Sequence, residues 1–201
     1  MVDCEQIAKQ RAENFIKIAE EMFGPMHSSW RYAGVFFQDD APLLSYAPRD
    51  GSVRIALSPR AKENIVVLDI ELAHECCHLL WPVAVYPPKE LEENYVIPSA
   101  NVINEGISTY FSILMIDHFH GGDVSSSIMQ KLQKGHPNYF ISFRAVTDLL
   151  RADPNAVKKI RKFNPSINEV TAEDFKSAKI EVSDKLLDIL LTPFDNTSIY
   201  S

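Results

Sequence analysis

The feature that most constrains this chain is the segment His74-Glu75-Cys76-Cys77-His78, which places two histidines four residues apart in an apolar stretch. The preceding residues 64–73 are mostly apolar, and the apolar residues 79–81 follow before Pro82. Proline cannot continue a helix, so the helix should end there. The pattern therefore predicts a largely buried helix over residues 65–81, with both histidines on one face and one turn apart.

Two imidazoles in this arrangement can hold one Zn²⁺ between them, and the glutamate after the first histidine can take a proton from a water molecule on the metal. Histidines and a glutamate are costly to bury in an apolar helix unless a partner satisfies them, and a metal ion does so. The alternative is an ordinary helix in which the spacing has no function. The apolar flanks favour a zinc site with His74 and His78 as ligands and Glu75 as general base.

A catalytic zinc ion needs a third protein ligand, and the best candidate is Glu105 in the segment 104–111. This segment belongs to a second predicted helix, which has Ser99 as its expected N-cap and ends before Gly121. Gly106 should let the two helices approach closely, because it has no side chain. The alternative is that Glu105 is a surface carboxylate near a helix N-terminus.

The segments His74-Glu75-Cys76-Cys77-His78 and Asn104-Glu105-Gly106 together resemble the gluzincin group of zinc metallopeptidases. The second segment is especially similar to the Asn-Glu-Gly segment of membrane alanyl aminopeptidases. The resemblance implies a minimal zincin-like domain, with His74, His78 and Glu105 as zinc ligands and Glu75 as general base. The chain departs from the aminopeptidase pattern in lacking the Gly-Ala-Met-Glu-Asn segment that holds a substrate amino terminus, so endo- and exopeptidase activity both stay open.

Peptide hydrolysis also requires a donor that stabilises the oxyanion, usually a tyrosine or a histidine. The downstream candidates are His118, His120, His136, Tyr139 and Tyr110. Tyr110 lies about 140° around the helix from Glu105, and His118 is similarly misplaced. His136 and Tyr139 lie in a loop segment that can be aimed at a cleft, so they are the predicted catalytic candidates beside Glu75. The alternative for each is a surface histidine or a packed tyrosine.

Histidines that bind a metal usually donate their second ring N–H to a neighbouring acceptor. Glu71 precedes His74 by three residues, and Asn101 and Thr109 lie four residues on either side of Glu105. These three residues are the expected partners of the site.

The remaining pattern predicts an α+β fold in a single zincin-like domain over residues 1–201. Residues 1–58 should form a helix over 3–23 and a small antiparallel sheet of about three strands, at 30–37, 43–46 and 53–57, with a hairpin turn at 48–51. Residues 59–201 should form the helical part with the metal site, with further helices near 123–134, 139–151, 154–162, 171–178 and 183–191. By the resemblance, strand 53–57 would be the edge strand that borders the cleft and binds an extended peptide. The proline-rich loop 82–98 would shape that cleft.

Charge and cysteine content limit the expected partners. The net charge of −7 offers no basic face for nucleic acid, and the basic cluster at residues 158–162 is typical of a solvated helix end. The sequence has no apolar run long enough for a transmembrane helix, no signal peptide at its start and only three cysteines, two of them adjacent. These features predict a cytoplasmic protein without a nucleic-acid or membrane partner, and the gluzincin resemblance implies a peptide or protein substrate.

Two alternatives to a zinc peptidase remain open on the sequence. One is a non-peptidase zinc hydrolase, or a related protein that has lost activity. The other is an interaction module in which zinc holds two helices together, and this alternative requires a closed site with four protein ligands.

Overall fold

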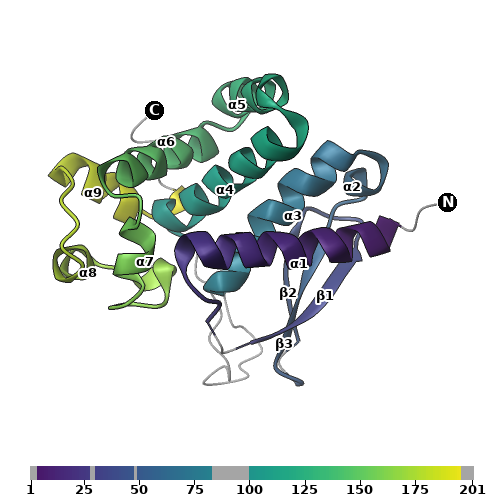
Figure 1. Ribbon diagram of the computed structural model, residues 1–201, viewed down its shortest axis with the longest axis horizontal. Coiled ribbons are helices and arrows are strands. Elements are labelled where there is room, and N and C mark those ends of the chain that lie inside the picture. Colours follow the sequence, from purple (N-terminus) through teal and green to yellow (C-terminus); the bar gives the residue numbers. More distant parts are fainter. Residues whose placement is uncertain (1–3, 28–29, 48, 83–99, 196–201) are drawn as a thin grey trace.

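The computed structural model describes residues 4–27, 30–47, 49–82 and 100–195, in which a three-stranded sheet precedes a mostly helical body (Figure 1). The N-terminal part consists of α1 (Cys4–Phe23), β1 (Arg31–Phe37), β2 (Leu43–Ala47) and β3 (Ser52–Leu57). The helical part consists of α2 (Arg60–Glu63), α3 (Ile65–Leu80), α4 (Val102–His120), α5 (Gly122–Gly135), α6 (Pro137–Ala152), α7 (Ala156–Ile160), the 3₁₀ helix η1 (Ile167–Glu169), α8 (Ala172–Ser177) and α9 (Asp184–Leu191). The predicted α+β fold class and order of elements are confirmed.

Side-chain caps explain where the two central helices begin. The Asn64 side chain accepts hydrogen bonds from the backbone N–H groups of Val66 and Val67 at the start of α3. At the start of α4, the Asn101 side chain accepts from the backbone N–H of Asn104 at 3.0 Å. Asn101 is therefore the N-cap of α4, whereas the expected cap, Ser99, lies outside the described residues. Residues 83–98 of the predicted cleft-shaping loop also lie outside them.

The strand order corrects two predictions about the sheet. The order is β1-β3-β2, with β2 antiparallel to β3 as the predicted hairpin requires, but with β1 parallel to β3, so the sheet is mixed. β3 is the central strand, and the prediction that residues 53–57 form an edge strand is wrong. The physical reason is that the backbone of β3 pairs with β1 on one side and with β2 on the other, and within β3 only Arg54 is exposed. The edge next to the site helix belongs to β2.

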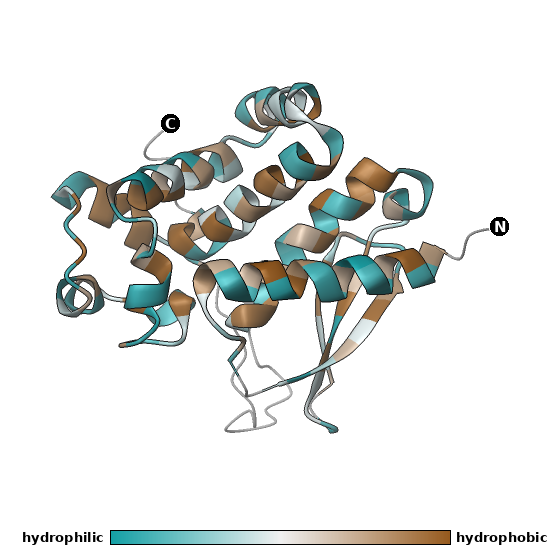
Figure 2. Ribbon diagram, in the orientation of Figure 1, coloured by the Kyte–Doolittle hydropathy of each residue, from teal (hydrophilic) through white to brown (hydrophobic). Residues whose placement is uncertain are grey.

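The site helix α3 packs between α1 and α4, and aromatic side chains fill the space where the three meet. The ring of Phe111 lies 6.3 Å from that of Phe15 and 6.1 Å from that of Phe23, and Phe23 lies 6.3 Å from Trp81, all in edge-to-face geometry. Helix α1 runs across the molecule with alternating hydrophilic and hydrophobic bands, and its buried face covers α3 (Figure 2). α3 is therefore held on two sides by apolar contact.

A buried carboxylate joins the same three helices away from the histidine pair. Asp69 of α3 is fully buried, and its Oδ2 lies 2.8 Å from Nε2 of His120 at the end of α4. Its Oδ1 lies 3.5 Å from Nε of Arg11 on α1. His120, one of the sequence candidates for the oxyanion donor, is therefore engaged in this contact instead of the site.

Gly106 allows a close approach of helices, but of a different pair from the one predicted. A Cβ atom at Gly106 would lie 2.4 Å from the backbone oxygen of Ser142 and 2.6 Å from a methyl group of Val146, both on α6. The prediction that Gly106 brings α3 and α4 together is therefore wrong. Adjacent helical residues point about 100° apart, so Glu105 can face α3 while Gly106 faces α6.

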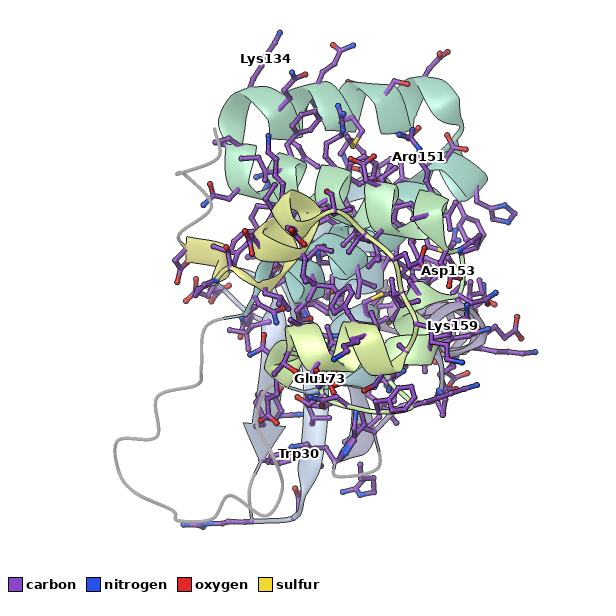
Figure 3. The ribbon with its side chains drawn as sticks, turned by 90° about the vertical axis from the view of Figure 1, so that its left-hand side faces the viewer. Trp30, Lys134, Arg151, Asp153, Lys159 and Glu173 are labelled. Carbon is purple, nitrogen blue, oxygen red and sulfur yellow. The ribbon has the colours of Figure 1, made fainter. Side chains whose placement is uncertain are left out.

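The basic cluster at residues 158–162 is not simply a solvated helix end. The guanidinium of Arg161 donates to the backbone oxygens of Phe23 and Gly24 at the end of α1, and to that of Leu80 at the end of α3. It also lies 5.0 Å from the ring of Trp81. Lys159 pairs with Asp153, and the two side chains lie together in Figure 3. Arg161 thus fastens the C-terminal ends of two helices.

None of the helices in the described ranges combines the length and the apolar character that crossing a bilayer requires.

Candidate metal centre

Helices α3 and α4 bring together the three side chains that the sequence predicts as metal ligands. The Nε2 atoms of His74 and His78 lie 3.0 Å apart. Glu105 reaches across from α4, with Oε2 at 3.3 Å from His74 Nε2 and Oε1 at 3.5 Å from His78 Nε2. Among the described residues, these three form the group whose ligand atoms lie within 4.8 Å of one another and could hold a metal ion.

The geometry of this group fits a small divalent cation. Two ligands of a tetrahedral zinc ion with bonds of about 2.0–2.1 Å lie roughly 3.3 Å apart, close to the separations seen here. Apart from its contact with His74, the buried Oε2 of Glu105 has no hydrogen-bond partner among the described residues. Burial by itself would raise the pKa of Glu105, but the adjacent His78 and His74 outweigh it and lower the pKa to about 2. The carboxylate is thus ionised and aimed at the two imidazoles.

A hydrogen-bond network behind His78 fixes which of its ring nitrogens faces the cluster. The indole N–H of Trp81, which can only donate, lies 2.6 Å from Oδ1 of Asn104. The same oxygen lies 3.1 Å from Nδ1 of His78, so Nδ1 must carry the proton. The Asn104 amide nitrogen faces Oδ1 of Asn168 at 3.4 Å, which agrees with this orientation. With the proton on Nδ1, it is Nε2 of His78 that faces Glu105 and His74, the nitrogen that a metal would bind.

The structure gives the three predicted orienting residues other partners. Glu71 accepts hydrogen bonds from the backbone N–H and the hydroxyl of Ser58, at 3.0 and 2.6 Å. Asn101 caps α4, and the Thr109 hydroxyl donates to the backbone oxygen of Glu105 at 2.8 Å. The sequence analysis missed Asn104 and Trp81, although Asn104 directly precedes Glu105 and Trp81 follows His78 by three residues.

Glu75 lies beside the cluster and is 5 % exposed. Burial raises the pKa of Glu75 to about 7; His78 opposes the rise, whereas the carboxylates of Glu105 and Glu71 add to it. A cation held by the cluster would favour the ionised form. A carboxyl group with a pKa near neutrality can both accept and return a proton.

A cavity of about 300 Å³ opens in front of these side chains. One wall is the β2 edge, with Leu43, Leu44 and Tyr46, and the other contains His74, Glu75, His78, Asn104, Glu105 and Tyr139. The β2 edge that faces away from β3 has no partner strand in the described part of the sheet. As far as the described residues go, the cluster is therefore open toward a cleft and is not enclosed by protein ligands on every side.

Tyr139 and His136, the two remaining catalytic candidates, stand at different distances from the cluster. The Tyr139 ring lies 6.0 Å from that of His74, and Tyr139 lines the cavity. Burial and the carboxylates of Glu105, Glu75 and Asp195 raise the pKa of Tyr139 to about 12, so its phenol is a hydrogen-bond donor at neutral pH. His136 is exposed, its ring lies 6.3 Å from that of Tyr139, and it lines a second cavity together with His74, Glu75 and Tyr139.

Comparison of the chain with protein-family models, with curated proteins and with solved structures found no match. The function must therefore be argued from the geometry of the site. Its two imidazoles and one carboxylate are a donor set that suits zinc and also Fe²⁺.

Proposed function

We propose that this protein is a zinc-dependent hydrolase that cleaves peptide bonds, related to the gluzincin metallopeptidases. The observation that carries the proposal is the convergence of His74, His78 and Glu105 beside a buried carboxylate, Glu75, at an open cavity. An iron oxygenase would use the same three donors but has no need of a buried glutamate at the open side. That residue favours zinc and hydrolysis over iron chemistry.

The residues around the cluster divide the chemistry among them. Zinc, when bound, would lower the pKa of water and polarise the substrate carbonyl. Glu75 would accept a proton from the attacking water and deliver it to the leaving amine. Tyr139, as a neutral phenol on the cavity wall, is the better candidate for donating a hydrogen bond to the developing oxyanion. His136 would act beside it, at the wall of the second cavity.

The position of β2 beside the cavity supports a peptide as substrate. An extended peptide can add to a strand edge through backbone hydrogen bonds, which hold the chain without reading its sequence. β2 lies along the cavity, with Leu43, Leu44 and Tyr46 on its wall. A peptide paired with this edge would pass directly in front of His74 and Glu75.

Two observations count against zinc as a purely structural element. The cluster has three candidate ligands in the described part of the chain, and it faces a cavity. A closed structural site needs a fourth protein ligand, and the neighbouring Cys76 is turned away, with Sγ 3.8 Å from the backbone oxygen of Ala12. The three free cysteines, Cys4, Cys76 and Cys77, further support our proposal of a reducing, cytoplasmic location.

The experiment compares Glu75→Gln and His74→Ala with the wild-type protein, using zinc content and hydrolysis of a mixed peptide library as the two readouts. Glu75→Gln should keep its zinc and lose hydrolysis by about 10²–10⁴-fold, because a general base is lost. His74→Ala should lose both.

A Glu75→Gln protein with full hydrolytic activity would rule out the assigned base. A proton on His74 Nε2 would satisfy the same three side chains without a metal, so a wild-type protein that fails to bind added zinc would overturn the proposal as a whole.

A further inference from the structure

A second cavity, of about 380 Å³, opens beside His74 and Glu75 and is lined by residues other than those of the β2 wall. Its apolar lining comes from three helices and a loop: Ile70 on α3, Ile113 on α4, Leu132 on α5, and Ala41 and Pro42 between β1 and β2. We call this cavity the apolar recess. Because His74, Glu75 and Tyr139 line both cavities, a peptide at the site has access to both.

Three of the polar side chains that line the recess, those of Glu71, Thr109 and Ser112, are already hydrogen-bonded within the protein, and its other polar lining residues, His74, Glu75, His136 and Tyr139, are those of the candidate site. Glu71 accepts two hydrogen bonds from Ser58, at 3.0 and 2.6 Å. The Thr109 hydroxyl donates to the backbone oxygen of Glu105, and the Ser112 hydroxyl donates to that of Ser108, each at 2.8 Å. The hydroxyl protons of these two side chains are therefore already used within the protein. A polar or charged guest would lose its hydration without gaining partners from them.

We infer that the apolar recess binds an apolar side chain of the substrate, on a residue adjacent to the bond that is cleaved. This inference rests on the proposed function and names its substrate class: peptides with a large apolar residue next to the cleavage site. The volume is at the lower end of the roughly 300–1,000 Å³ range of ligand pockets, which suits one side chain. Burial of apolar surface supplies the affinity.

Leu132 is the wall residue best suited to a test of this assignment. It projects from α5, is partly exposed, and is neither a candidate ligand nor a proton carrier. Arginine at this position would place a positive charge on the wall of the recess. Gln133 is the next residue on the same helix and is exposed, so Gln133→Arg adds the same charge outside the recess.

The first measurement is cleavage-site mapping by mass spectrometry, with the zinc-loaded wild-type protein and a mixed peptide library. Large apolar residues should be enriched about tenfold or more over acidic residues at one position next to the cleaved bond. Leu132→Arg should shift that position toward Asp and Glu, whereas Gln133→Arg should keep the wild-type preference. Cleavage without a side-chain preference at either adjacent position would overturn the inference and leave the proposed function standing.

The second measurement is binding without turnover, by calorimetry on zinc-loaded Glu75→Gln. The probes are two blocked peptides that differ only in a central Leu or Asp. The Leu peptide should bind at least about tenfold more tightly, and Leu132→Arg in the same background should reverse the order. If the Leu peptide binds more tightly but the wild-type protein cleaves no peptide, the proposed function is wrong and the assignment of the apolar recess is supported. Equal binding of both peptides would overturn the recess.

Discussion

At the scale of single residues, the site depends on which nitrogen of His78 carries the proton. Asn104 presents its carbonyl oxygen to His78 Nδ1 because the indole N–H of Trp81 already occupies that side of the amide. If the Asn104 amide were reversed, its NH₂ group would face the indole N–H of Trp81 and Nδ1 of His78. The lone pair of His78 would then be on Nδ1 and would point away from the cluster. Trp81 and Asn104 thus orient His78 for the metal binding that we propose.

We predict that Asn104→Leu lowers zinc affinity by about 10–100-fold, the usual effect of losing the group that orients a metal-binding histidine. Asn104→Asp should restore most of the affinity, because a carboxylate accepts hydrogen bonds from both His78 and Trp81. Competition with a zinc chelator measures the affinities.

The tautomer of His78 gives a second readout that a general loss of stability would not change. Nitrogen–proton correlation spectra of the metal-free protein should show Nδ1–H in the wild type and in Asn104→Asp, and a mixture in Asn104→Leu. Wild-type zinc affinity together with an unchanged tautomer in Asn104→Leu would refute this role of Asn104.

The sequence predicted which side chains converge better than it predicted the contacts that position them. The spacing of His74 and His78 and the segment around Glu105 were enough to select the three side chains that converge. Asn104 and Trp81 could not be paired from sequence, because their contact depends on how α4 crosses the end of α3. Glu71 has suitable spacing from His74, but Ser58 already occupies its carboxylate.

At the scale of elements, α4 positions Glu105 because two faces of this helix make contacts at once. Glu105 faces the α3 histidines, while the next residue, Gly106, lies against the backbone of α6. The close contact of Gly106 with α6 on one face of α4 therefore sets the position of Glu105 on the other face.

We predict that Gly106→Ala destabilises the protein by about 2–3 kcal/mol, because its Cβ would press on backbone that cannot rotate away. The Ser142 oxygen would lie 2.4 Å from the added carbon. The displacement of α4 should also weaken zinc binding at Glu105. Denaturant unfolding of the metal-free protein measures the first effect.

Gly135→Ala is the matched control, since a Cβ atom there would meet nothing within 4 Å. It should leave stability unchanged or raise it by about 0.5–1 kcal/mol, through helix propensity and a more restricted unfolded chain. If Gly106→Ala were as stable as Gly135→Ala, the contact between α4 and α6 would not constrain the site.

Helix and strand positions followed from periodicity and caps, but the strand order did not. The pattern at residues 53–57 is short. A strand with one solvated face and a strand with both faces buried differ there mainly in whether the side chain of Ala56 is covered. β1 covers β3 by joining it in parallel, a long-range pairing that the turn between β2 and β3 does not encode. The cleft therefore borders β2 instead of β3.

At the scale of the whole molecule, the site helix is fixed by contacts from distant parts of the chain. Arg161, between α7 and η1, donates to Leu80 at the end of α3, with four helices between the two residues in sequence. Asp69 connects the middle of α3 to Arg11 and His120. These contacts tie the C-terminal end and an interior position of the site helix to other helices, and His74 between them lines both cavities.

The basic cluster at residues 158–162 shows why such contacts escape a sequence-based prediction. Cations near a helix C-terminus are usually solvated, and nothing local distinguishes Arg161 from its neighbours. Its role depends on the carbonyl groups at the ends of α1 and α3, which become its acceptors only in the folded chain. Burial lowers the pKa of Arg161 to about 10, so it stays charged at neutral pH.

The most direct test of the central claim is the position of zinc in crystals of the zinc-loaded protein, located by anomalous scattering on both sides of the zinc absorption edge. The account predicts a single peak at about 2.0–2.2 Å from His74 Nε2, His78 Nε2 and a Glu105 oxygen, with Glu75 outside bonding distance. A zinc peak elsewhere, or no peak at these three side chains after loading, would contradict it.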